Sequence, residues 1–273
     1  MPAWNAAAFI GSVLESLADQ TYANLHVLVS VDLSDDGTAE VCTKFAQRYS
    51  NFEVLRQSTR LGWVENSNVL LRQAKGDYLF FAFHDDPVLP TYVSRLVEVM
   101  ERNPNAANVF ADMSSDRGIE AYCELEGVTD RFDRASRLLT PSGPWWCPNR
   151  GLFRADVATQ IGGLRRHMGG EFGADWPWLM SLALRGEFVR VPEPLIFKNR
   201  RPEGLNAQFI KSATFWKRLS VRLACLREIR RARPPLVTSA QLHMRSLVSF
   251  AREERWLVQR KWLSRTRFRR SPH

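Results

Sequence analysis

The sequence predicts an α/β fold in which a mostly parallel central sheet is flanked by helices. Short apolar segments with strand character, 25–31, 52–55 and 77–83, alternate with helical patterns over 38–49 and 64–74. This β-α-β-α-β order requires parallel strands joined by right-handed crossovers. The last of these strands is the clearest. Its six apolar residues from Tyr78 to Phe83 are typical of a strand that is buried on both faces.

The first helix follows from capping and periodicity. Asn5 is expected to be the N-cap of a helix whose apolar residues recur at helical spacing, namely Ile10, Val13, Leu14 and Leu17. A strand should precede this helix, and only Met1 to Trp4 stand before Asn5. We therefore expect the first strand to be truncated.

The elements after residue 90 are less regular. A helix is predicted from Thr91 to Asn103, a strand at 108–111, a helix from Asp175 through Leu184, and a last strand at 188–191 that ends at Pro192-Glu193-Pro194. Residues 114–148 show no clear periodicity and are predicted to form a long irregular loop, a type of segment that often carries specificity.

Charge and periodicity both change after residue 204. Residues 205–273 hold 17 Lys and Arg against three Glu, a balance of +14, which leaves residues 1–204 at −5. We expect a compact domain over 1–204 and a basic helical segment over 205–273, broken at Pro234-Pro235. A fold that bound nucleic acid with its whole surface would not divide its charge in this way, and no nucleic-acid partner is expected.

The four cysteines lack CxxC spacing, which indicates neither a zinc site nor a disulfide framework. No window reaches the roughly 18 apolar residues of a membrane span, and the N-terminus lacks the basic start of a signal peptide. A cytoplasmic location is expected.

Asp85 and Asp86 stand at the end of the 77–83 strand, and ligands in open α/β sheets bind beyond the carboxyl ends of strands. Two adjacent carboxylates repel unless a cation joins them. Because successive strand residues point to opposite sides, one should bind a divalent metal and the other a different part of the ligand. The alternative is that Asp85-Asp86-Pro87 is a turn that leads into the helix at Thr91.

Several motifs occur together in an order that resembles the family 2 glycosyltransferases, which have the GT-A fold and transfer sugars from nucleotide-sugar donors with inversion. The motifs are Pro2-Ala3-Trp4-Asn5, 16–22, Val31-Asp32-Leu33-Ser34-Asp35-Asp36-Gly37-Thr38, Arg60-Leu61-Gly62, Asn68, 74–78, His84-Asp85-Asp86 and Asp175-Trp176. The resemblance covers about residues 1–200.

The resemblance implies a role for each matching residue. Asp32 accepts the N–H of the donor base, and Pro2 lines the same pocket. Asp85 is the ribose-side carboxylate, Asp86 is the ligand of a divalent metal (Mn²⁺ or Mg²⁺), and Asp175 is the general base. The metal offsets charge on the departing nucleoside diphosphate, and the base takes the proton of the acceptor hydroxyl.

Each role has a structural alternative. Asp32 and Asp36 can cap the helix after Ser34, and Asp175 can be an N-cap. Trp145 and Trp146 can be core residues or can face the sugar in an acceptor cleft.

The sequence departs from the family pattern at two places. With the first strand truncated, either the chain begins further upstream or one side of the nucleotide pocket is unsupported. Many members have a histidine after the last strand, and Lys198-Asn199-Arg200-Arg201 occupies that region here. Arg200 or Arg201 can hold the diphosphate directly, which weakens the case for an essential metal.

Two functions remain open. The first is a glycosyltransferase that uses a nucleotide sugar, which the resemblance implies is a UDP-sugar, to extend a polysaccharide or a lipid-linked acceptor. The second is a glycosyltransferase-like binding or scaffold protein without catalysis. The basic tail, with Phe209, Trp216, Leu223, Trp256 and Trp262, is expected either to rest on an anionic membrane surface or to pack on the body.

Overall fold

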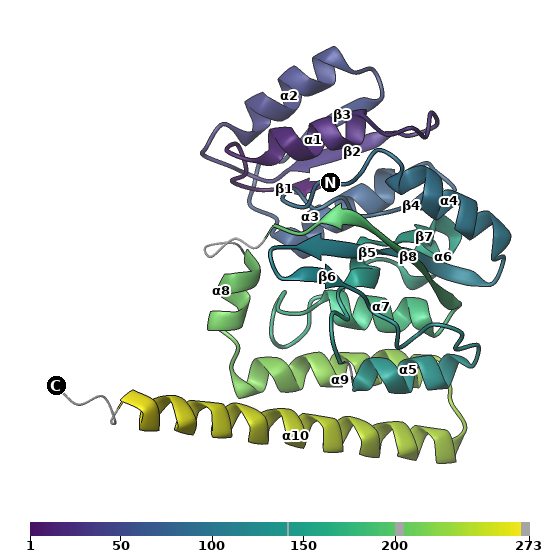
Figure 1. Ribbon diagram of the computed structural model, residues 1–273, viewed down its shortest axis with the longest axis vertical. Coiled ribbons are helices and arrows are strands. Elements are labelled where there is room, and N and C mark those ends of the chain that lie inside the picture. The colour runs from purple at the N-terminus through teal and green to yellow at the C-terminus, as the bar shows by residue number, and fades with distance from the viewer. Residues whose placement is uncertain (141, 200–204, 269–273) are drawn as a thin grey trace.

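The structure is a computed structural model that describes residues 1–140, 142–199 and 205–268, without the side chains of residues 205, 206, 210 and 260–268. Helices and strands alternate along the first part of the chain (Figure 1). The strands are β1 (Pro2–Ala3), β2 (Val27–Val31), β3 (Phe52–Arg56), β4 (Tyr78–Leu79), β5 (Ala106–Ser115), β6 (Gly118–Glu120), β7 (Leu152–Arg154) and β8 (Glu187–Phe197). The helices are α1 (Ile10–Ala18), α2 (Thr38–Arg48), α3 (Trp63–Gln73), α4 (Tyr92–Arg102), α5 (Arg131–Leu139), the 3-10 turn η1 (Cys147–Arg150), α6 (Ala155–Ile161), α7 (Asp175–Ala183), α8 (Leu205–Lys211), α9 (Phe215–Arg231) and α10 (Leu236–Phe268).

The strands form two sheets. In the first sheet, β1, β2 and β3 are parallel, with β2 in the middle. In the second sheet, β5 pairs in parallel with β8 and antiparallel with β6 and β7, and β7 also pairs with β4. Helices α1 and α2 accompany the first sheet, and α7, α9 and α10 lie in layers below the second (Figure 1). The predicted α/β class, with a parallel sheet flanked by helices, is confirmed.

The start of the chain differs from the sequence prediction. β1 is present as a two-residue strand in which Pro2 pairs with Ser30 and Ala3 with Val31. Asn5 does not cap α1. It adopts a left-handed φ of 44°, and its side-chain amide donates to Asp35 Oδ1 at 2.8 Å. Asn5 thus joins its own loop to the loop after β2, and the helix begins only at Ile10.

The predicted strand over 77–83 is largely wrong. Only Tyr78 and Leu79 pair with a neighbour, and that neighbour, β7, is antiparallel. Phe81 and Ala82 are buried as expected, but the chain then turns, since Asp86 N–H donates to the Phe83 carbonyl at 3.3 Å. The alternation argument for Asp85 and Asp86 therefore does not apply, because the two residues are not in an extended strand.

The last strand is longer than predicted. β8 continues past Pro192 and Pro194 to Phe197 alongside β5. The register moves from Ala111 opposite Val191 to Asp112 opposite Pro194, so two residues of β8 have no partner at this point. This bulge accommodates prolines that lack the N–H of a regular ladder.

Residues 114–148 are more ordered than predicted. They contain the hairpin strand β6 and the helix α5, whose N-cap Asp130 accepts hydrogen bonds from the N–H groups of Phe132 and Asp133. The sequence pattern missed α5 because its buried face includes Arg134, which donates to main-chain carbonyls instead of reaching solvent.

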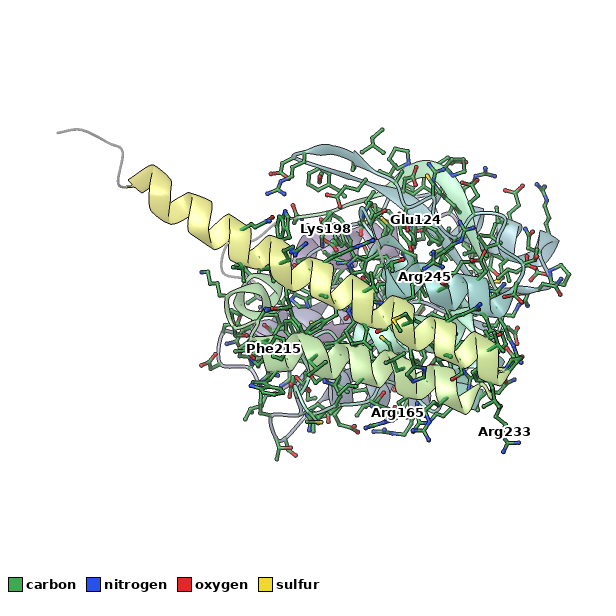
Figure 2. The ribbon with its side chains drawn as sticks, turned by 90° about the horizontal axis from the view of Figure 1, so that it is seen from below. Glu124, Arg165, Lys198, Phe215, Arg233 and Arg245 are labelled. Carbon is green, nitrogen blue, oxygen red and sulfur yellow. The ribbon has the colours of Figure 1, made fainter. Side chains whose placement is uncertain are left out.

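The C-terminal segment is helical, with the predicted break at Pro234-Pro235. Residues 209–226 form two helices, not one, and Thr214 accepts a hydrogen bond from Lys217 N–H at the start of α9. Arg222 on α9 is buried, and it donates to Leu139 O and to Glu253. Figures 1 and 2 show that α10 runs beside α9 and projects past it.

The buried face of α9 belongs to the same hydrophobic cluster as the second sheet. Val221, Cys225 and Ile229 pack there with residues of α7. The division at residue 204 stays a prediction, but α9 clearly contributes core to the body. Among the described residues, we find no helix that is both long enough and apolar enough to span a bilayer.

We expect Ile229→Ala to lower the free energy of unfolding by about 2–5 kcal/mol, because Ile229 is fully buried and its loss leaves a cavity. The matched control is Leu223→Ala on the same helix, where the side chain is 43% exposed and the cost should stay below about 1 kcal/mol. Denaturant unfolding of the full chain measures both. Equal effects in the two variants would contradict the docking of α9.

Candidate active site

One part of the site lies at the carboxyl ends of β1 and β2. Asp32, the residue after β2, is buried, and its two oxygens bind the loop that precedes α3. Oδ1 accepts from Leu61 N–H at 2.8 Å, Oδ2 accepts from Gly62 N–H at 2.9 Å, and Arg60 forms an ion pair with Oδ2. Asp32 thus fixes the 60–62 loop and does not cap the following helix.

Arg60 lies over this end of the sheet. Its guanidinium carbon is 3.9 Å from the centre of the Trp4 ring, so the cation is held between an aromatic face and the carboxylate of Asp32. With Leu33 N–H also bonded, at 3.0 Å, the carboxylate has donors at all of its roughly four acceptor positions. A base N–H can reach Asp32 only by taking the position of Arg60, which is partly exposed. The base-binding role of Asp32 stays a prediction, as does that of Pro2, whose carbonyl lies 3.2 Å from His84 Nδ1.

The second part of the site is the turn at Asp85 and Asp86. Asp86 is buried, and its Oδ2 accepts from Arg150 Nε at 3.0 Å, Arg150 Nη2 at 2.8 Å and Lys198 Nζ at 3.3 Å. Its Oδ1 accepts from Asn199 N–H at 3.1 Å. Asp85 is partly buried, and its carbonyl accepts from the Asn199 side chain at 2.7 Å.

These charges determine the protonation of the cluster. Burial raises the pKa of Asp86, but the charges of Arg150 and Lys198 outweigh it and hold that pKa below its usual range. Burial, followed by the neighbouring Arg150, lowers the pKa of Lys198. Asp86 is therefore an ionised carboxylate that binds two side-chain cations.

Arg150 is fixed from three sides. It is the last residue of η1, its guanidinium carbon lies 4.1 Å from the centre of the Phe83 ring, and its carbonyl accepts from Tyr92 Oη on α4. Gly151 follows, and it must be glycine because a Cβ there would meet the Asn108 side chain and the Val109 carbonyl at under 3 Å. The close approach of η1 to β5 places the Arg150 guanidinium next to the carboxylate of Asp86.

The third part of the site is Asp175, the first residue of α7. The residue at the cap position is Ala174, and Asp175 Oδ2 accepts from the Asn149 side chain at 2.6 Å. Burial raises the pKa of Asp175, and the charge of Arg150 and the hydrogen bond from Asn149 partly offset this effect. A carboxylate with a raised pKa is suited to accept a proton.

Aromatic side chains lie next to Asp175. Trp145 stacks on Trp176 with 5.0 Å between ring centres, and Trp146 donates from Nε1 to Glu120 Oε2 at 3.0 Å. Trp145 and Trp146 are partly buried against the core, so they are neither free platforms nor full core residues. Arg200 and Arg201 lie outside the described residues.

The residues around Asp86 do not fit a divalent metal. A metal needs free carboxylate oxygens, and both oxygens of Asp86 already accept hydrogen bonds, three of them from cationic nitrogens. In the part of the chain that is described, no three or more His, Cys, Asp and Glu side chains gather as a possible metal site. The metal-ligand role of Asp86 therefore finds no support in its contacts.

Comparison with known proteins identifies the family to which this chain belongs. The model of glycosyl transferase family 2 matches residues 1–142, which is more than half of the chain. The chain belongs to glycosyl transferase family 2. An uncharacterized glycosyltransferase of Haemophilus influenzae is 35% identical over 201 residues, covering 72% of this chain and 66% of that protein. The uncharacterized glycosyltransferase YibD of Escherichia coli is 29% identical over 147 residues, covering 54% and 41%.

Solved structures show the same fold. Residues 1–349 of S. aureus TarS, in complex with UDP-GlcNAc, superpose with a TM-score of 0.71 at 19% identity, covering 88% of this chain and 68% of that one. The mannosyltransferase PcManGT from Pyrobaculum calidifontis, in complex with GDP-Man and Mn²⁺, superposes with a TM-score of 0.55 at 15% identity, covering 91% and 78%. These likenesses confirm the GT-A fold expected of a family 2 member.

Two residues that connect Asp175 to the acidic turn at Asp86 were missed in the sequence analysis. Asn149 and Arg150 are adjacent in η1, and they bind Asp175 and Asp86 respectively. Their only sequence signal is a polar pair between Pro148 and Gly151 just before an apolar strand. Lys198 and Asn199 were noted as a departure from the family pattern, and in the structure Lys198 binds Asp86 while Asn199 binds both Asp85 and Asp86.

Proposed function

We propose that this chain transfers a sugar from a nucleoside diphosphate donor, a UDP-sugar, to a hydroxyl acceptor with inversion at the anomeric carbon. The observation that carries the proposal is Asp175. Its carboxylate is held by Asn149, lies within the field of Arg150, and has a pKa that burial raises. It is thus a carboxylate fixed beside the acidic turn and suited to act as a base.

The donor side of the proposal rests on the sheet edge. Asp32 and Pro2 are assigned to the base pocket, Asp85 to the ribose, and Asp86 to the diphosphate region. Asp32, Asp85 and Asp86 lie beyond the carboxyl ends of β2 and the 80–83 segment, where ligands bind in open α/β sheets, and Pro2 lies in the neighbouring strand β1. The TarS complexes with UDP and UDP-GlcNAc support a uridine nucleotide as donor.

In the proposed step, Asp175 accepts the proton of the acceptor hydroxyl as its oxygen attacks the anomeric carbon. The bond to the diphosphate oxygen breaks with its electron pair on that oxygen. Attack from the face opposite the leaving group inverts the carbon. The base contributes roughly 100- to 10,000-fold in rate if it behaves like other general bases.

The acceptor is proposed to be a saccharide or a lipid-linked saccharide precursor reached from the cytoplasmic side. The partly exposed pair of Trp145 and Trp176, stacked beside Asp175, offers aromatic surface for the C–H face of a sugar. Arg222 lies over Trp176 at 4.7 Å from the ring centre and fixes its orientation.

The alternative is a glycosyltransferase-like binding module without catalysis. The sequence argument for it was the truncated first strand. Pro2 and Ala3 occupy that strand position beside Ser30 and Val31, which removes part of the argument. A binding module would bind UDP without turnover, and the next experiment separates the two functions.

Asp175→Asn should bind UDP within about twofold of the wild-type chain and lose at least roughly 100-fold in turnover, because the change removes proton acceptance and keeps the side-chain shape. Calorimetry measures binding, and UDP release from a panel of UDP-sugars with saccharide acceptors measures turnover. Asp133→Asn at the start of α5, where the carboxylate is 45% exposed, is the matched control and should retain both. Full turnover by Asp175→Asn would refute the base, and UDP binding without turnover by the wild type would favour the binding module.

Asn149→Ala should move the acidic limb of the pH–rate profile to higher pH. Asn149 donates to ionised Asp175 and so lowers its pKa, and its removal raises that pKa further. Because only the ionised form accepts a proton, activity should rise with pH through this pKa and do so later in the variant. Asn103→Ala, whose side chain donates to Val99 O at the end of α4, is the control. If the acidic limb stays at the same pH in Asn149→Ala, the ionisation of Asp175 does not control the rate.

The basic C-terminal segment is proposed to touch an anionic membrane surface, where a lipid-linked acceptor would lie. Trp216 is 71% exposed and Trp256 is 55% exposed, on helices that carry many Arg residues. Exposed Trp beside basic residues is typical of surfaces at the headgroup level. Phe209, by contrast, packs on Phe172, and Trp262 and the Arg265–Arg270 end have no described side chains.

Sedimentation with anionic and neutral liposomes tests this surface. The full chain should bind anionic vesicles, less so as salt rises, and Trp216→Ala with Trp256→Ala should weaken that binding. Because both side chains are exposed, the double variant should keep its melting temperature. Equal binding to neutral vesicles, or no loss in the double variant, would reject the membrane surface.

A further inference from the structure

The contacts of Asp86 leave little room for a metal and point to its two cationic partners. Arg150 and Lys198 approach the same oxygen from different elements, η1 and the end of β8. Their side chains are 12% and 11% exposed. A metal ion on Asp86 would have to displace both cations or sit beside them against their repulsion.

Both cations keep N–H groups for a further anion. Among the described residues, the side-chain hydrogen bonds of Arg150 use Nε and Nη2, both toward Asp86, and those of Lys198 use one bond to Asp86. An Arg has five such donors and a Lys has three. One carboxylate therefore holds two cations that are nearly shielded from water and have donors to spare. The nearby charges of Asp85 and Asp175 also act on Arg150.

The position of these cations suits a diphosphate. They lie between the acidic turn, where the proposed donor binds, and Asp175, where the acceptor proton is taken. Guanidinium and ammonium groups bind phosphate oxygens by short, charge-assisted hydrogen bonds. They would be closest to the bond between the anomeric carbon and the diphosphate.

We propose that Arg150 and Lys198 bind the diphosphate of the donor and offset the charge on the departing nucleoside diphosphate in place of a divalent metal. This inference rests on the proposed function and specifies its leaving-group side. The bond from the anomeric carbon to the β-phosphate oxygen breaks, the electron pair stays on that oxygen, and the oxygen accepts hydrogen bonds from the two cations. The acceptor proton goes to Asp175. Asp86 is a positioning residue that keeps the two cations side by side.

The test is calorimetric titration of UDP into the full chain, once with EDTA and once with Mn²⁺. We expect Kd values within about twofold of each other. Lys198→Met should weaken UDP binding on the order of tenfold in both buffers, and Lys198→Arg should restore most of it because the cation returns. Lys75→Met, on an exposed residue after α3, changes the net charge equally and should leave Kd unchanged.

Asp86→Asn separates the two accounts most sharply. A metal ligand would lose only Mn²⁺-dependent binding on this change, whereas here the two cations lose the carboxylate that keeps them side by side, and UDP binding should weaken by the same factor in EDTA and in Mn²⁺. If this variant does not fold, the Lys198 series decides.

Loss of UDP binding in EDTA, with recovery in Mn²⁺ and no effect of Lys198→Met, would overturn the metal-free account and leave the proposed transfer intact. Absence of UDP binding under every condition would overturn the proposed function and this inference with it.

Discussion

The ion pair between Asp86 and Arg150 is the interaction on which the rest of the site depends. Arg150 contacts the turn at 83–86 through its guanidinium and α4 through its carbonyl, and its neighbour Asn149 holds Asp175. Asp86 is buried and the side chain of Arg150 is only 12% exposed, and removal of one partner of a buried pair costs about 3–5 kcal/mol. The pair thus couples the donor side of the site to the acceptor side through a single four-residue turn.

Carboxylates also organise the neighbouring loops at this edge of the sheet. Asp32 binds the amides of the 60–62 loop, and Glu171 accepts from the N–H groups of Trp63 and Val64 at the start of α3. Gly62 has a positive φ of 80°, and a Cβ there would meet the carboxylate of Glu171 at 2.4 Å. These contacts tie the proposed base pocket to the loop that leads into α7 and Asp175.

Much of the fold could be predicted from the sequence because local periodicity sets it. The strand ending at Val31, the helices beginning near Thr38 and Trp63, and the helix from Tyr92 follow patterns that span only a few residues. The predicted strand over 77–83 failed because apolar residues alone cannot show which neighbour pairs with them. The prediction that the last strand ends at Pro192-Glu193-Pro194 was wrong for a similar reason. The sequence of one strand does not show that it can form a bulge against its neighbour β5.

The sequence pointed to the acidic residues of the candidate site but not to the residues that bind them. Asp32, Asp85, Asp86 and Asp175 stand out because they follow predicted strands or begin a predicted helix in an order that resembles a family pattern. Arg150 and Lys198 lie 64 and 112 residues from Asp86 in the chain, so no local pattern links them. We expected the adjacent carboxylates to require a metal. That expectation did not consider that cationic side chains from distant elements can supply the same positive charge.

The most direct test of this account is a crystal structure of the chain grown with UDP and Mn²⁺ and measured with anomalous scattering at the manganese edge. The account predicts UDP at the ends of β1 and β2, with phosphate oxygens within about 3.2 Å of nitrogens of Arg150 and Lys198 and no manganese peak at Asp86. A manganese peak bonded to the Asp86 carboxylate, with Arg150 and Lys198 turned away from the phosphates, would contradict it.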